Sequence, residues 1–374
     1  MSTELVEQEN IMRNVISLFL YTNDLMCEYS QTNKEVFLRH HFLSSYGGLC
    51  IAGASSYMCD IRPDIDYIVN MEHCNKIDLN YGLGSLSDPI IFSFDMVSKH
   101  ISYVSYLHLI LTQDNIYQIK SGRKILVAPV PILYLSDGAS TGLGHMTALV
   151  IDTASKKIEY FDPNYNPKDT ERVNIIENMI QTRILTREFY GDLFDGYSFV
   201  TSHQIFGDKG GWQHISDNYL IKLYGITLTP EEKNMYVAGY CVMWTLLYCI
   251  IRTITLDYPS EETSSLIGKL LPEVAFETSL RYKNNMNEPV ESSTELSLSI
   301  LIRNFASNVI KGLLEDTCDP EFLDNRSLQI YRSELMEIDY KDEINHCGNS
   351  RLYGDANKVV KQYKKVKSRE KSRR

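Results

Sequence analysis

The sequence predicts an α+β fold, and three features lead to that expectation. A mostly apolar run, His145–Asp152, is followed across a short Thr-Ala-Ser-Lys segment by the alternating run Lys156–Phe161, so the two are expected to form a hairpin of strands. The segment Ala238–Ile254 is apolar on nearly every face, which indicates a central buried helix. Beyond Leu256, apolar residues recur at steps of three and four, which is typical of further helices.

The other elements of the core are expected in chain order. Lys124–Leu135 is rich in β-branched and apolar residues, but its prolines confine it to an edge strand or a broken one. The segment Ser136–Gly144, rich in Gly and Ser, is expected to be the loop that ends this strand. A long helix is expected over Asp169–Phe189, and a short strand over Tyr197–Ser202.

Four regions are expected along the chain. Residues 1–115 form a mostly helical accessory region, because helical periodicity is visible in Met12–Phe19, and residues 116–256 form the core. Residues 257–340 are helical, with capping-box spacing at Ser292–Glu295 before an apolar stripe. Residues 341–374 are a polar linker and a disordered basic tail.

Charge separates the tail from the rest of the protein. The 374 residues carry a formal net charge of -11, which argues against nucleic-acid binding by the body of the protein. In Lys358–Arg374, by contrast, six lysines and three arginines stand against one glutamate. This tail is either a solvated charge run or a segment for nuclear import or weak nucleic-acid contact. The apolar segment Asn14–Leu25 is too short to span a bilayer, so no membrane contact is expected.

The eight cysteines are irregularly spaced. They form neither a compact disulfide framework nor a C-x-x-C metal pair, so an intracellular, reducing compartment is the expected location. His73 and Cys74, taken with Cys50 and Cys59, fit no zinc-finger or zinc-ribbon spacing. No metal site and no cofactor are therefore expected.

His145, Asp162 and Cys241 carry the chemistry that the sequence suggests. Cys241 stands at the first turn of the expected central helix, where backbone N–H groups and the helix dipole favour a thiolate. His145 begins one strand of the expected hairpin and Asp162 follows the other, so their side chains are expected to meet. A cysteine nucleophile, a histidine base and an aspartate that orients the imidazole make up the triad of a thiol enzyme.

Each of these residues also has competitors. A cysteine in an apolar helix is more often a packing residue, and Cys249, two turns further on, is the alternative nucleophile. Asp152 and Asp169 compete with Asp162 for the orienting role, although Asp162 is preferred because it ends the partner strand.

An acyl-transfer site also needs donors for the oxyanion that develops. Gln213, in the segment Gly-Gly-Trp-Gln-His, is the preferred side-chain amide, and Asn234 is the alternative. His203 and His214 flank the glycine-rich segment and are weaker candidates for substrate contact.

Four segments in this order resemble the ubiquitin-like-protein protease and adenovirus-protease superfamily of cysteine proteases, particularly the proteases of large DNA viruses. The matching segments are Gly144-His145, Phe161-Asp-Pro163, Gly211-Trp-Gln213 and Gly239-Tyr-Cys-Val-Met-Trp244. The resemblance covers about a third of the chain. Met146 and Val242 stand where cellular members usually have Trp and Gly, and Met235 stands where their glutamine lies. The oxyanion role of Gln213 therefore follows the viral pattern.

The resemblance implies a papain-like core, in which a mixed sheet packs on a central buried helix, with helical additions at both ends. It implies a cysteine endopeptidase that uses the triad named above and cleaves after small residues, at Gly-Gly-X or Gly-X sites. Trp212 and Trp244 are the candidates for aromatic side chains that cover the substrate. The implied protein substrate is a viral structural precursor or a ubiquitin-like conjugate, in the host cytoplasm or nucleus or in the virion.

Two other functions remain open at this point. Effector-type acyltransferases resemble the same order of histidine, acid and cysteine, and they transfer the acyl group to an acceptor other than water. Alternatively, the protein has a protease-like fold without enzymatic activity, and its basic tail contacts nucleic acid.

Overall fold

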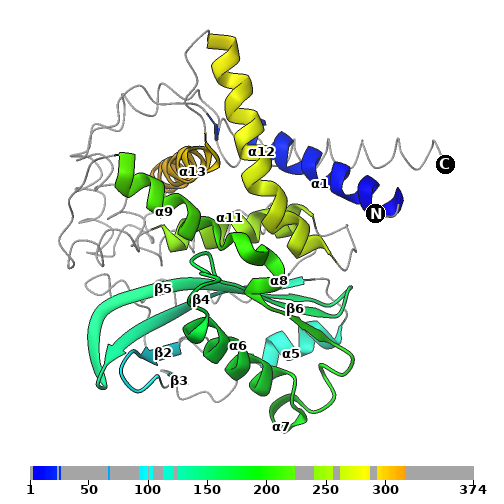
Figure 1. Cartoon of the computed structure of the whole chain (residues 1–374). Coiled ribbons are helices and arrows are strands. Elements are labelled where there is room, and N and C mark those ends of the chain that lie inside the picture. Colours follow the sequence, from blue (N-terminus) through cyan, green and yellow to red (C-terminus); the bar gives the residue numbers. More distant parts are fainter. Residues whose placement is uncertain are drawn as a thin grey trace.

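The structure is a computed structural model that describes residues 3–22, 25–26, 66–67, 92–99, 101–103, 113–121, 125–223, 240–255, 262–286 and 293–316. This part of the chain is a mixed α/β structure, compatible with the expected α+β class, in which one sheet lies between two layers of helices (Figure 1). The tail Lys358–Arg374, the linker before it, Asn234 and the cysteines at positions 50, 59 and 74 lie outside the described residues.

The described strands form one mixed sheet. Its order is β3-β2-β4-β5-β6-β7, with β1 also paired to β4. The central strands β4, β5 and β6 are antiparallel, whereas β1 and β2 run parallel to β4, and β7 runs parallel to β6. The strands are β1 (Asp66–Tyr67), β2 (Phe92–Asp95), β3 (Ile101–Tyr103), β4 (Ile125–Ser136), β5 (Ala139–Asp152), β6 (Lys157–Phe161) and β7 (Ser198–Val200).

The hairpin expected around residue 154 is confirmed, since Ala148 pairs with Phe161 and Asp152 with Lys157. One other expectation was wrong. Residues 139–144 belong to β5, so the expected loop at Ser136–Gly144 shrinks to a turn at Asp137 and Gly138. Among the described residues before position 115, residues 3–22 form a helix, and three short strands, at 66–67, 92–95 and 101–103, join the sheet.

Strand β4 is an inner strand despite Pro129 and Pro131. On one edge it pairs with β5, and on the other it pairs with β1 at Leu126–Val127 and with β2 at Ile132–Leu135. Alternate residues of a strand direct their backbone groups to the same edge, so the two prolines share an edge. The pairing with β5 continues past both prolines, whereas neither β1 nor β2 pairs with residues 128–131, so the missing N–H groups interrupt no pairing between described strands.

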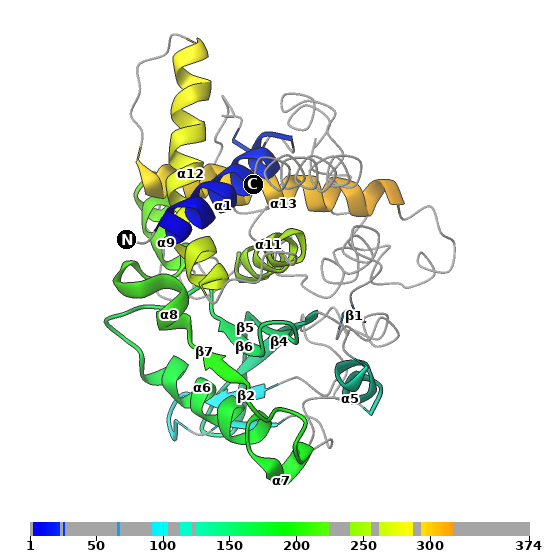
Figure 2. The same ribbon diagram turned by 90° about the vertical axis from the view of Figure 1, so that its right-hand side faces the viewer.

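Helices cover both faces of the sheet. Helix α6 lies on one face, while α11 lies on the other with α12, α13 and α1 beyond it (Figures 1 and 2). The helices are α1 (Thr3–Thr22), α5 (Gln113–Lys120), α6 (Glu171–Ile184), α7 (Arg187–Tyr190), α8 (Ser202–Phe206), the 3₁₀ turn η1 (Gly207–Lys209), α9 (Trp212–Leu223), α11 (Cys241–Ile254), α12 (Thr263–Met286) and α13 (Thr294–Asp316).

Helix α1 is attached to the C-terminal helices. Arg13 donates to Glu277 at 2.8 Å and to Glu273 at 2.9 Å on α12. The Asn304 amide of α13 donates to the carbonyl of Leu25, just beyond α1, at 3.0 Å. Among the helices of the described ranges, none combines the length and apolar character that crossing a bilayer requires.

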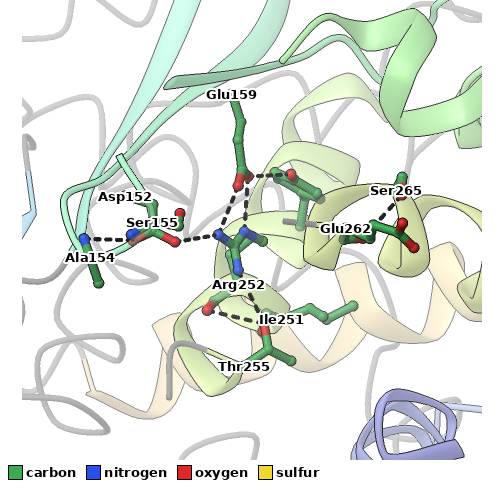
Figure 3. Close-up of polar contacts among 10 residues, drawn as sticks. Asp152, Ala154, Ser155, Glu159, Ile251, Arg252, Thr255, Glu262 and Ser265 are labelled. Carbon is green, nitrogen blue, oxygen red and sulfur yellow. Dashed lines mark hydrogen bonds and ion pairs between the residues drawn. The ribbon is translucent and has the colours of Figure 1, made fainter. Parts of the chain in front are cut away.

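Helix α11 is buried along its whole length. This agrees with its apolar composition, but the helix also carries Arg252, whose side chain is only 1% exposed. The guanidinium donates to both carboxylate oxygens of Glu159 on β6, at 2.8 and 2.9 Å, and to Asp152 on β5 at 3.4 Å (Figure 3). The hydroxyl of Tyr248 also donates to Glu159, at 2.8 Å. The buried charge is thus paired and hydrogen-bonded, as burial requires.

We expect Glu159→Gln to lower the free energy of unfolding by about 3–5 kcal/mol, because it leaves the Arg252 charge in the core without its main partner. The double variant Glu159→Gln with Arg252→Met should lose less than the single variant, since no unpaired cation remains. Urea unfolding measures both. Arg187 pairs with Asp195 at the surface, where its side chain is 73% exposed, so Arg187→Met is a matched control that should change stability little. Equal losses of unfolding free energy in Glu159→Gln and Arg187→Met would contradict the role of burial in this ion pair.

Candidate functional site

The hairpin of β5 and β6 brings His145 and Asp162 into contact. His145 lies within β5, opposite Ile132 of β4, and Asp162 directly follows β6. The imidazole Nε2 and the carboxylate Oδ1 are 2.7 Å apart. The imidazole is almost fully buried and the carboxylate fully buried, so the pair is shielded from competing water.

Cys241 is the first residue of α11, and its side chain interacts with that of His145. Because Asp162 occupies Nε2, the ring nitrogen that remains for the thiol is Nδ1. The Thr245 hydroxyl, one turn into the helix, donates to the carbonyl of Met146 at 3.1 Å and so fixes α11 beside the histidine strand.

Arg172 and Asn164 also donate hydrogen bonds to the Asp162 carboxylate, and neither was predicted as a site residue. Arg172, on α6, donates to Asp162 Oδ2 at 2.7 Å and also donates to the hydroxyl of Tyr134 on β4. The backbone N–H of Asn164 donates to Asp162 Oδ1 at 2.8 Å. Both carboxylate oxygens are therefore held, and the one that faces His145 cannot rotate away without breaking three contacts.

The sequence contains a signal for Arg172. It precedes Ile176 by four residues and Ile180 by eight, so it lies at the border of the apolar stripe with which α6 faces the sheet, and its side chain is 23% exposed. A charged residue in such a stripe needs a buried partner of opposite charge.

The charges at the site support one another. Burial alone would lower the pKa of His145, but the Asp162 carboxylate, together with Tyr134 and Cys241, outweighs it and raises that pKa well above the usual value. Burial alone would raise the pKa of Asp162, but Arg172 and His145 outweigh it and hold that pKa well below its usual range. The geometry thus favours an imidazolium beside the thiol at neutral pH.

The glycine-rich segment before α9 lies against the turn that follows Asp162. The Gly211 N–H donates to the carbonyl of Tyr165 at 2.7 Å, and the Gln213 N–H donates to that of Pro163 at 2.9 Å. A Cβ on Gly211 would lie 2.3 Å from the Pro163 oxygen, so only glycine permits this approach. The contact places Gln213, which is fully buried, beside the turn that carries the Asp162 carboxylate.

Gly211→Ala should separate these two segments, because the methyl group overlaps the Pro163 carbonyl. We expect a loss of about 1–3 kcal/mol in the free energy of unfolding, and a loss of any activity that depends on Gln213. Gly138→Asn is the control, since Gly138 lies in an open hairpin turn with a φ of +77° that asparagine tolerates. Thermal unfolding that is unchanged by Gly211→Ala would contradict the close approach.

Trp212 and Trp244 require a correction. Both are 0% exposed, and their rings lie 5.7 Å apart within an aromatic cluster that includes Phe161 and Tyr248. The Trp212 Nε1 also donates to the carbonyl of Gly268 at 3.1 Å. Both indoles are core residues in this structure, and neither presents a face to a bound peptide.

The alternatives to Cys241 and Asp162, namely Cys249, Asp152 and Asp169, have different surroundings. Cys249 is fully buried on α11, and burial raises the pKa of its thiol, which disfavours the thiolate. Asp152 accepts from the N–H groups of Ala154 and Ser155 and pairs with Arg252. Asp169 is exposed.

His203 and His214 flank the glycine-rich segment. The ring of His203 contacts a tyrosine hydroxyl, and the pKa of His214 is lowered. Nδ1 of His203 lies 2.9 Å from the Tyr165 hydroxyl. Burial and Lys168 lower the pKa of His214. Within the described ranges, no cluster of three or more His, Cys, Asp or Glu side chains has the arrangement of a metal site.

The described site therefore consists of a thiol at a helix start, an imidazole held by a carboxylate, an arginine behind that carboxylate and a buried amide beside it. No family model matches this chain, and no curated protein or solved structure is significantly similar to it.

Proposed function

We propose that this protein is a cysteine endopeptidase with a papain-like core, acting on a protein substrate with small residues, Gly-Gly-X or Gly-X, before the scissile bond. One observation carries the proposal, namely the buried imidazole of His145 between the Asp162 carboxylate and the Cys241 thiol. The mixed sheet packed on α11 supports the core assignment. A viral structural precursor or a ubiquitin-like conjugate inside the host cell is the proposed substrate.

In the proposed reaction, the Cys241 thiolate attacks the carbonyl carbon of the scissile peptide, and the carbonyl oxygen takes up the negative charge. The backbone N–H of Cys241 and the side-chain amide of Gln213 donate to this oxyanion. His145, as imidazolium, donates its proton to the amine nitrogen as the C–N bond breaks, which leaves a thioester. Water then attacks the thioester with His145 as the base, and the free acid and the thiolate–imidazolium pair are restored.

Arg172 has a supporting part in this scheme. It keeps Asp162 ionised and holds one carboxylate oxygen, so that the other remains directed at His145. An ionised Asp162 in turn stabilises the imidazolium on which both the thiolate and the proton transfer to the amine depend.

A Gly-Gly peptide vinyl sulfone tests the proposal on the full-length protein. The thiolate should add to the vinyl carbon β to the sulfonyl group, with the imidazolium supplying a proton to the carbon next to the sulfonyl, and peptide mapping by mass spectrometry should find the adduct on Cys241. Cys241→Ala should abolish labelling, and Cys249→Ala should leave it unchanged because that thiol is closed to solvent and lies two turns deeper.

Two results would contradict the proposal. A Cys241 that reacts with neither the vinyl sulfone nor iodoacetamide at neutral pH would favour a non-enzymatic protein. Stable acetylation of a partner protein from acetyl-CoA, without cleavage of any peptide, would favour the acyltransferase.

A further inference from the structure

Asp217 is a buried acid that the proposed reaction does not use. It follows Gln213 by four residues on α9, so the two side chains lie on the same face of that helix. Gln213 Nε2 donates to Asp217 Oδ2 at 3.0 Å, and the residues are 0% and 6% exposed. No described residue hydrogen-bonds the other carboxyl oxygen, and none forms a salt bridge with this acid.

The pair lies next to the reaction centre. The backbone of Gln213 is held on the turn after Asp162, and Asp217 interacts electrostatically with His145. The helix that carries both residues packs against α13, where the Ser299 hydroxyl lies 3.4 Å from the carbonyl of Ser216. The carboxyl therefore has a fixed position from which to act on the amide.

The amide of glutamine is planar, and its two N–H bonds lie in that plane at fixed angles. A hydrogen bond from one N–H to a fixed acceptor therefore sets the direction of the other. Glutamine otherwise has several rotatable bonds, and its rotation would weaken a donor that must be in place before charge develops. We propose that Asp217 is a positioning residue that holds the Gln213 amide in the orientation needed to donate to the oxyanion.

Asp217 can do this without disturbing the triad. A carboxyl that is buried with a single hydrogen bond and no salt bridge is disfavoured as an anion. Burial accordingly raises the pKa of Asp217 well above the usual value, although His145 opposes the rise. As a neutral acid, Asp217 still accepts from Nε2, and it does not compete with Asp162 for the imidazolium.

The inference rests on the proposed function, and the test compares Asp217→Leu with Asp217→Asn in the full-length protein. The probe is a Gly-Gly aminomethylcoumarin peptide, and the readouts are kcat and KM, the rate of Cys241 alkylation by iodoacetamide, and thermal unfolding. Leucine has a similar size but cannot accept a hydrogen bond, whereas the asparagine oxygen can accept from Nε2. Asp217→Ala serves as a second apolar variant if the leucine variant does not fold.

Asp217→Leu should lower kcat by about 10- to 100-fold with little change in KM, approaching the effect of Gln213→Ala, which should be about 10²- to 10³-fold. Asp217→Asn should restore kcat to within about threefold of wild type, because its oxygen replaces the acceptor. Alkylation needs no oxyanion donor and should not change. In a Gln213→Ala background, Asp217→Leu should have no further effect on kcat.

Three results would overturn the role of Asp217 while leaving the proposed protease intact. They are a full kcat in Asp217→Leu, an equal loss of kcat and of alkylation rate, and an undiminished effect of Asp217→Leu when Gln213 is already alanine. A wild-type protein that is alkylated but does not turn over the peptide would instead contradict the proposed function, and the inference with it.

Discussion

His145→Ala should lower kcat for cleavage of a Gly-Gly reporter peptide by about 10⁴- to 10⁶-fold. The imidazole is expected to favour the Cys241 thiolate, to protonate the leaving amine and to activate water, so its removal affects every step of the proposed reaction. Initial rates at neutral pH measure the loss, and the alkylation of Cys241 by iodoacetamide should slow as well because the thiolate loses its counter-ion.

His203→Ala is the matched control for this experiment. His203 is an exposed histidine whose ring contacts the Tyr165 hydroxyl and no member of the triad. We expect it to leave kcat unchanged. If the two histidine variants cleaved the peptide equally well, the imidazole of residue 145 would be a structural group and the thiol-protease proposal would be wrong.

Asp162→Asn should lower kcat by about 10⁴-fold, because an amide neither stabilises the imidazolium nor holds the same tautomer. The pH dependence should change in a defined direction. Asp162 raises the pKa of His145 despite burial, so its loss lowers that pKa, and the alkaline limb of the kcat/KM profile should move to lower pH. Full pH–rate profiles of wild type and variant measure the shift.

Asp169→Asn is the control for charge, since Asp169 is an exposed acid in the same region. It should leave both kcat and the alkaline limb in place. An alkaline limb that stays fixed in Asp162→Asn would show that the carboxylate does not set the protonation of His145.

The features that the sequence predicted are those specified by local patterns. The β5–β6 hairpin joins neighbouring segments with alternating or apolar runs, and α11 is a continuous apolar segment, so periodicity is sufficient for both. The contact of His145 with Asp162 follows from the hairpin alone. The position of Gln213 could not be predicted from local patterns alone, because it depends on the close approach of Gly211 to the Pro163 carbonyl, 48 residues earlier in the chain.

The features that the sequence analysis missed depend on non-local pairing. Strands β1 and β2 join β4 in parallel across long connections, which no local pattern specifies. Tyr134 reaches Arg172 only because the sheet and α6 pack face to face. Trp212 and Trp244 were misassigned because an indole in an apolar segment has the same pattern whether it covers a ligand or fills a core.

Helix α11 carries Cys241, the proposed nucleophile, at one end and the buried Arg252 near the other, eleven residues apart, or about 16 Å along the axis. Thr245 fastens the first end to β5, and Arg252 fastens the second to β6. The helix can therefore neither slide along the sheet nor turn about its axis without losing one of these attachments. A substitution of Glu159 would then let α11 shift and would displace the Cys241 sulfur from His145. One displacement would lower both the stability of the protein and its proposed catalytic activity.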